Sequence, residues 1–221
     1  MRTILTAVML LGTASLCAQT ATPWRSSFPV DRKTLGVKGN NPYLPLTPDT
    51  QWTYKRGKEF EVITVLDTTR VIDGIECRPV EDREESSGQL VTRTLDYYAI
   101  DPATNDIYYM GEDVDEYRNG KVVSHPGSWL SGVNGATFGM LLPGTPKVGD
   151  RFYQEQAPGS KDRIEIRSTD DRITTPAGTF EHCVLVAVSS PIEKGISYKW
   201  YARGIGAVKD AEMVLETYGK K

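Results

Sequence analysis

Beyond residue 50, apolar and polar residues follow one another in short alternating segments that are typical of β-strands. Segment 59–67 (EFEVITVLD) predicts a strand with one buried face, and the wholly apolar segment 183–188 (CVLVAV) predicts a central strand covered on both faces. Hairpin-type turn dipeptides separate such segments, as at Asp73–Gly74, Asn119–Gly120 and Asn134–Gly135. The pattern therefore predicts an all-β fold with little helix: an antiparallel curved sheet, a sandwich or a half-barrel.

Two segments, 62–82 and 164–188, repeat the same order of features. Each contains a β-rich strand, a turn with Asp, Thr and Arg, a glycine, and then a strand that carries a cysteine. Duplicated meanders commonly pack together to bury one shared core. We therefore predict a domain built from two related meander units, 51–110 and 160–221. The alternative is a chance similarity between two β-rich segments.

The first 18 residues have the features of a secretory signal peptide. An apolar run at 4–16 leads to small residues, and we place the cleavage site after Ala18. The run is shorter than the ~20 residues that a membrane-spanning helix needs. The alternative is a lipoprotein acylated at Cys17, but Leu16 stands where such proteins normally carry a small residue. We therefore expect a periplasmic or secreted protein with no transmembrane span after cleavage.

The mature chain divides into an arm and a single β domain. Residues 19–50 are rich in proline and lack a periodic apolar pattern, which predicts an extended arm. Residues 51–221 form the predicted domain, and its middle segment, 111–159, has no counterpart in the repeat. Rigid scaffolds commonly display functional residues on such connecting segments. We therefore expect 111–159 to contribute to a binding site.

Export also changes how the cysteines are interpreted. If Cys17 leaves with the signal peptide, Cys77 and Cys183 remain as an even pair in an oxidising compartment. We predict a disulfide between them, which would close a loop of about a hundred residues and add roughly 2–4 kcal/mol to stability. The alternative is two buried free thiols that pack as small apolar side chains.

The composition argues against several functions. The chain has 26 Lys and Arg against 29 Asp and Glu, a net charge of −3, so it lacks the basic surface that binds nucleic acid or anionic membranes. It carries only two histidines, His125 and His182, and none of the sequence motifs of serine hydrolases, zinc proteases or nucleotide-binding proteins. Because histidine is the usual general base near neutral pH, common acid–base catalysis is disfavoured.

Carboxylates are the remaining candidates for chemistry. Asp101, Asp106 and Glu112 lie in the acidic stretch 101–116, and their oxygens are ligands that calcium prefers. These residues predict a calcium site in a calcium-stabilised structural module. The spacing does not match an EF-hand, and acidic runs are commonly solvated surface.

A carboxylate-based hydrolase is another alternative. Its candidate acids are Glu112, Glu155 and Asp162. Glycoside hydrolysis needs two carboxyl groups on either side of the scissile bond, so their separation in the fold decides whether they can act as a pair.

A set of short motifs occurs in order over most of the mature chain: NPYLPLTP (41–48), WTY (52–54), DGIEC (73–77), DYYAID (96–101), NDIYYMGE (105–112), GSW (127–129), GVNGA (132–136), PKVGD (146–150) and YARGIG (201–206). Together they resemble a family of exported bacterial proteins of unknown function, although Ile100 and residues 104–106 depart from its pattern. The closing strand resembles the last strand of lipoprotein-carrier-like curved β-sheets, which implies the fold. The family has no established reaction or ligand, so the resemblance implies no catalytic residue.

The leading hypothesis is a non-enzymatic binding module of the bacterial envelope. Its ligand would be a lipid, a glycan or a protein partner, held by the concave face and the 111–159 loops. Aromatic side chains beside polar residues are typical of binding surfaces, with core residues as the ordinary alternative. The candidate ligand-binding residues are Tyr98, Tyr109, Trp129, Tyr201 and Arg203.

Overall fold

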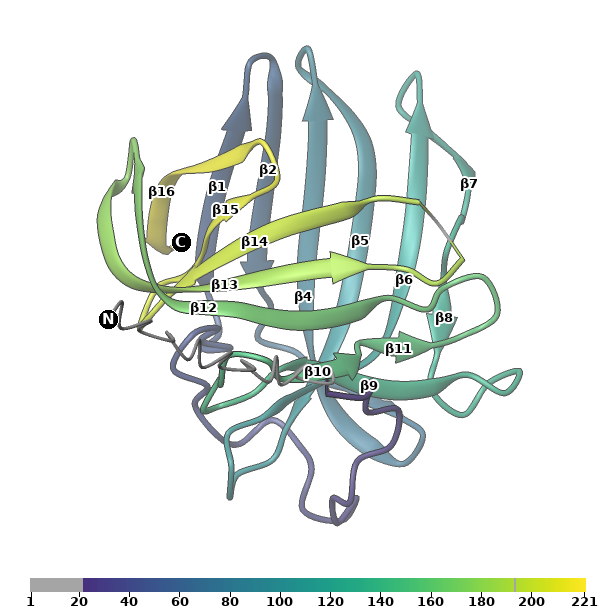
Figure 1. Ribbon diagram of the computed structural model, residues 1–221. Coiled ribbons are helices and arrows are strands. Elements are labelled where there is room, and N and C mark those ends of the chain that lie inside the picture. The colour runs from purple at the N-terminus through teal and green to yellow at the C-terminus, as the bar shows by residue number, and fades with distance from the viewer. Residues whose placement is uncertain (1–21, 193) are drawn as a thin grey trace, which may run out of the picture.

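Figure 1 shows the computed structural model, which describes residues 22–192 and 194–221. The predicted signal peptide and Cys17 lie outside the described residues. Within them the chain forms no helix, and its strands make one antiparallel sheet that curves without closing into a barrel. The predicted all-β curved sheet is confirmed. The described residues include no helix long and apolar enough to cross a membrane.

The strands in the described residues range from two to 13 residues in length, and those at the two ends of the sheet are short. In chain order, those in the described residues are β1 (Thr50–Arg56), β2 (Glu59–Val65), β3 (Arg70–Ile72), β4 (Ile75–Ser86), β5 (Gln89–Ile100), β6 (Ile107–Arg118), β7 (Lys121–Ser124), β8 (Trp129–Leu130), β9 (Thr137–Leu142), β10 (Arg151–Tyr153), β11 (Glu155–Gln156), β12 (Arg163–Thr175), β13 (Gly178–Ser189), β14 (Ile196–Ala202), β15 (Gly206–Asp210) and β16 (Met213–Lys220). Neighbours pair in the order β10-β12-β13-β14-β15-β16-β1-β2-β4-β5-β6-β9-β11. In addition, β3 pairs with β4, and β7 and β8 both pair with β6.

The sheet folds over on itself and encloses its concave face. In Figure 1, β1, β2, β4, β5 and β6 stand side by side, and β12, β13 and β14 cross in front of them. The two ends of the hydrogen-bonded order, β10 and β11, are consecutive in the chain and separated only by Gln154. The chain therefore brings the two ends of its own sheet together.

Gly139 in β9 allows this close approach. A Cβ atom at Gly139 would lie 2.2 Å from the carbonyl oxygen of Tyr153 and 2.5 Å from that of Gln154. These distances are far shorter than van der Waals contact, so a larger residue would push β9 away from the β10–β11 connection.

Hairpin turns form at two of the three predicted dipeptides, whereas the strands before and after Asn134–Gly135, β8 and β9, do not pair with each other. Asp73 and Gly74, between β3 and β4, have φ angles of 50° and 78°, and Asn119 and Gly120, between β6 and β7, have φ angles of 52° and 70°. Positive φ at both central residues gives the turn a twist that matches the twist of the flanking strands.

The described part of the arm packs against the sheet. Leu35 and Leu46 belong to the hydrophobic core, and Gly36 pairs with Ile100 at the end of β5. The completely buried Asn41 donates hydrogen bonds from Nδ2 to the carbonyl oxygens of Asn105 and Leu142 and accepts two from backbone amides of the arm. These contacts hold the arm over one end of the concave face.

The structure does not form the predicted disulfide. Cys77 of β4 and Cys183 of β13 are both buried free thiols. Their strands are separated in the sheet by β14, β15, β16, β1 and β2.

Both cysteines should react as free thiols only after unfolding. Burial raises the pKa of Cys77 to about 12 and that of Cys183 to about 11, so neither should react with iodoacetamide in the native protein near neutral pH. After denaturation without a reductant, mass spectrometry should find both thiols alkylated. A peptide pair linked through these two cysteines would contradict the prediction.

Gly139→Ala should destabilise the fold, because the new methyl group would clash with the backbone of the β10–β11 connection. We expect the free energy of unfolding to fall by about 1–3 kcal/mol, measured by chemical denaturation. Gly36→Ala is the matched control, since nothing lies within 4 Å of a Cβ atom there. Equal losses in the two variants would show that the close approach at Gly139 is not a constraint.

Candidate functional site

The concave face encloses a cavity of about 210 Å³. Strands from both halves of the sheet line it, and Leu44 and Leu46 of the arm cover part of it. Its other apolar lining residues are Ile63, Val80, Leu141, Ile164, Val188 and Ala207. Its aromatic and polar lining residues are Trp52, Tyr54, Tyr98, Tyr109, Tyr201, Gln154, Glu61, Asp82, Asp96, Lys199 and Asp210.

Strand alternation explains why charged side chains reach this cavity. Glu61 and Ile63 point to the same face of β2, and Asp82 of β4 pairs directly with Ile63. Asp96 of β5 pairs with Val80 of β4 and also faces inward. A concave face that served only as a core would carry apolar residues at these positions. The chain instead places carboxyl groups among apolar side chains.

The carboxyl groups in the cavity differ in their partners. Lys199 Nζ lies 2.6 Å from Asp210 Oδ2, so these two form an ion pair. The hydroxyl group of Tyr109 donates a hydrogen bond of 2.6 Å to Asp96 Oδ1. In contrast, Asp82 Oδ1 is buried and has no hydrogen-bond partner. The cavity therefore holds an acceptor that the protein itself does not satisfy.

Burial raises the pKa values of the carboxyl groups that lack a basic partner. For Asp82, burial is the largest cause, and the charge of Glu61 adds to it. Burial also raises the pKa of Glu61 and of Asp96. For Lys199, burial acts to lower the pKa, but nearby negative charge, with Asp210 first, outweighs it and raises the pKa. The site thus favours protons or cations close to its carboxyl groups.

A second hollow, of about 340 Å³, adjoins the cavity and shares Glu61 and Asp210 with it. Arg56 is the basic residue among its lining residues, and it donates a hydrogen bond of 2.7 Å from Nε to Glu59 Oε2. We call this hollow the acidic vestibule. Its other acidic lining residues are Glu84, Glu85 and Glu212.

The structure brings together three of the five predicted ligand-binding residues, because Tyr98, Tyr109 and Tyr201 all line the cavity. Trp129 lies behind them and packs edge-on against Tyr109, with ring centroids 5.3 Å apart. Arg203 is exposed, with its guanidinium group 5.8 Å from the ring centroid of Tyr43.

Sequence reasoning missed the charged residues of the cavity, namely Glu61, Asp82, Asp96, Lys199 and Asp210. The signal was present in segment 59–67, where the alternation puts Glu61 on the same face as apolar Ile63 and Val65. A charged residue at a position where the strand's side chains point inward indicates either the edge of a sheet or a polar interior.

The three acids predicted for a hydrolase, Glu112, Glu155 and Asp162, do not line the cavity. Burial raises the pKa of Glu112 to about 8 and that of Glu155 to about 7. The charge of Glu155 contributes to the shift of Glu112, so the two groups are near each other. Glu155 Oε1 accepts hydrogen bonds from Ser160 Oγ at 2.8 Å and from the backbone N–H of Asp162 at 2.6 Å.

The predicted calcium ligands are not brought together. Asp101 accepts a hydrogen bond from the backbone N–H of Ala103, and Asp106 accepts one from that of Gly144. Both lie next to the turn between β5 and β6, whereas Glu112 lies within β6. Among residues 22–192 and 194–221, no group of three or more His, Cys, Asp or Glu side chains could hold a metal ion. The described residues therefore do not assemble the predicted set of calcium ligands, and the two turn carboxylates bond to backbone amides instead.

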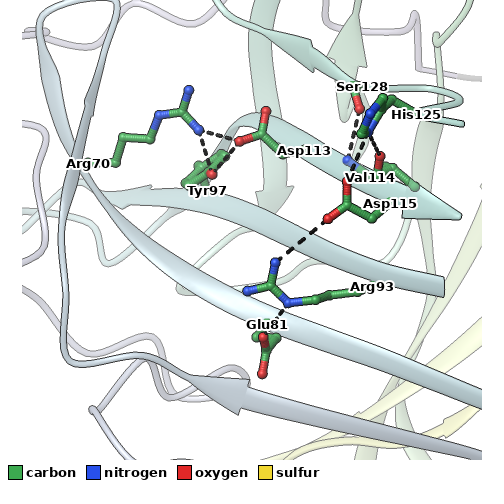
Figure 2. Close-up of polar contacts among 9 residues, drawn as sticks. All are labelled: Arg70, Glu81, Arg93, Tyr97, Asp113, Val114, Asp115, His125 and Ser128. Carbon is green, nitrogen blue, oxygen red and sulfur yellow. Dashed lines mark hydrogen bonds and ion pairs between the residues drawn. The ribbon is translucent and has the colours of Figure 1, made fainter. Parts of the chain in front are cut away.

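The opposite face of β4, β5 and β6 carries charged residues that are paired with one another. Figure 2 shows Arg93 between Glu81 and Asp115, at 2.6 and 3.8 Å, and Asp115 beside His125 at 2.9 Å. A separate group on this face joins Arg70, Tyr97 and Asp113. Ion pairs therefore occupy the outer face, and carboxyl groups without basic partners occupy the cavity.

Comparisons with known proteins give one structural likeness. No protein-family model and no curated protein matches the chain. A solved structure of a candidate lipoprotein from Parabacteroides distasonis ATCC 8503 is similar, with 16% identity and a TM-score of 0.41 over 82% of this chain and 100% of that chain. We draw no functional conclusion from a likeness at this level.

Stability should fall as the pH rises from about 5 to about 8. The folded chain raises the pKa of Glu112 to about 8 and that of Glu155 to about 7, from an ordinary value of 4.5. The folded state therefore binds more protons than the unfolded chain in this range. The stabilisation is complete below the ordinary pKa and is lost as the pH rises through the folded-state pKa values. Melting temperatures measured by circular dichroism across this range should show the slope.

Glu112→Gln should flatten this pH dependence and raise the melting temperature at the alkaline end, because the amide carries no proton to lose. Glu76→Gln is the control, since Glu76 is exposed on β4. An unchanged slope in Glu112→Gln would show that Glu112 titrates with an ordinary pKa.

Proposed function

We propose that this protein is a non-enzymatic, exported binding module of the bacterial envelope that holds a small molecule in its concave cavity. The observation that carries the proposal is the cavity itself: it is enclosed by both halves of the sheet and lined by four tyrosines and by carboxyl groups without basic partners. An enclosed space with apolar walls and a few polar groups is the usual form of a small-molecule site. The arm and residues of the 111–159 segment, Leu141 and Gln154, complete the lining.

Unsatisfied groups in the interior support a binding role. A buried acceptor without a donor, such as Asp82 Oδ1, costs free energy in the empty protein. Groups that reduce stability in this way are typical of functional sites, where a ligand supplies the missing partner.

The position of the other acids favours binding over hydrolysis. Glu112 and Glu155 have pKa values in the range of a general acid, but neither lines the cavity, and Glu155 is only 1% exposed. A substrate in the cavity would face the aromatic walls and the carboxyl groups of Asp82 and Asp96 instead.

Native mass spectrometry of the protein purified from its own cells should show a bound small molecule that denaturation releases. Val188→Trp should remove most of this bound mass, because the indole would fill the cavity that Val188 lines. Val71→Trp is the matched control, since Val71 is 69% exposed and lies outside the cavity.

Two results together would contradict the proposal. The purified protein would have the mass of the chain without a ligand, and no compound in a chemically diverse fragment set would raise its melting temperature. Equal occupancy in Val188→Trp and Val71→Trp would place the ligand elsewhere.

A further inference from the structure

The charges that face the cavity do not balance. Lys199 is the one basic residue among the lining residues that the structure describes, and it pairs with Asp210 at 2.6 Å. Glu61, Asp82 and Asp96 remain in the same cavity without a basic side chain of their own. The cavity therefore carries an excess of carboxyl groups over cations.

A positive group that would balance these carboxyl groups is missing at Asp82. Its carboxyl group is buried, faces the cavity, and has one oxygen, Oδ1, without a hydrogen-bond partner. A hydroxyl or amide ligand would supply a donor but leave the charge excess in place. An ammonium group supplies N–H donors and positive charge together, and charge-assisted hydrogen bonds of this kind are the stronger type.

The hollow next to the cavity favours the same charge. The acidic vestibule shares Glu61 and Asp210 with the cavity and adds several further carboxylates, while its one basic lining residue, Arg56, is already paired with Glu59. Clefts lined by one sign of charge concentrate ligands of the opposite sign and repel ligands of the same sign.

The walls indicate an organic cation. The rings of Tyr54, Tyr98 and Tyr201 line the cavity next to apolar side chains such as Leu44. Aromatic rings attract ammonium groups through their negative faces, and apolar side chains cover the attached carbon atoms. The described residues offer no group of three or more carboxylates, histidines or cysteines arranged to hold a bare metal ion.

We propose that the cavity binds a small organic cation, with its ammonium group at Asp82, Glu61 and Asp96 and its carbon skeleton against the tyrosine rings. This inference rests on the proposed function, since it names the ligand class of the same cavity. The volume of about 210 Å³ limits the ligand to a small amine, and a longer chain would extend into the acidic vestibule.

Three probes that share a butyl chain test the charge requirement: n-butylammonium, n-butanol and n-pentanoate. Isothermal titration calorimetry and thermal unfolding are measured at equal ionic strength, near neutral pH, on protein from which bound molecules were removed by unfolding and refolding. We expect n-butylammonium to raise the melting temperature and to bind at least about tenfold more tightly than either other probe.

Asp82→Asn tests the position of the ammonium group. The amide keeps the shape of the side chain but removes its charge, so the affinity for n-butylammonium should fall by at least about tenfold. Asp67→Asn is the matched control, because the Asp67 side chain is 79% exposed, and its affinity should stay within about twofold of the wild type. If Asp82→Asn does not fold, Glu61→Gln is measured in the same way.

The outcomes separate this inference from the proposed function. Equal binding of n-butanol and n-butylammonium, or an unchanged affinity in both Asp82→Asn and Glu61→Gln, would overturn the charge requirement while the cavity remained a binding site. Binding of n-pentanoate alone would overturn it as well. No binding of n-butylammonium, together with a neutral or anionic molecule found by native mass spectrometry, would leave the proposed function standing and reject the cationic ligand.

Discussion

One long sheet folds back so that its two end strands, β10 and β11, approach each other through Gln154 beside Gly139, and the enclosed concave face depends on that approach. Without that approach, the side chains of β2, β4 and β5 that point into the cavity would face solvent. Glu61, Asp82 and Asp96 would then be ordinary surface carboxylates with little effect on stability. Because the sheet folds over on itself, the same side chains lose solvation, and their pKa values rise.

The two faces of β4, β5 and β6 show how the surroundings of a charged residue change its effect on stability. On the outer face, Arg93 lies between Glu81 and Asp115, and such partly exposed pairs near the surface contribute about 0–1 kcal/mol each. On the inner face, Asp82 has a buried oxygen without a partner. A buried oxygen that lowers stability because it lacks a hydrogen-bond donor is best explained by a ligand, which is why the proposed function rests on the inner face.

The sequence predicted the fold better than the site. Alternation in 59–67 and the turn dipeptides at Asp73 and Asn119 depend on local physics, because the direction of a side chain and the φ angle of a turn residue are set within a few residues. The disulfide between Cys77 and Cys183 and the calcium site at Asp101 and Asp106 required knowledge of which distant segments meet. The structure forms neither, since strand order separates the cysteines and backbone amides bind the two turn carboxylates.

The sequence by itself determined that the chain forms antiparallel strands with hairpin turns, that Tyr98, Tyr109 and Tyr201 stand beside polar residues, and that acidic residues slightly outnumber basic ones. Only the tertiary structure decided which acidic residues face inward together. Strands β2, β4 and β5 meet β14 and β15 across the cavity, so Glu61, Asp82 and Asp96 come together with Lys199 and Asp210 although they are far apart in the chain. The physical reason is that burial and unbalanced charge are properties of an enclosed space, and no local pattern of residues encodes the closure of a sheet on itself.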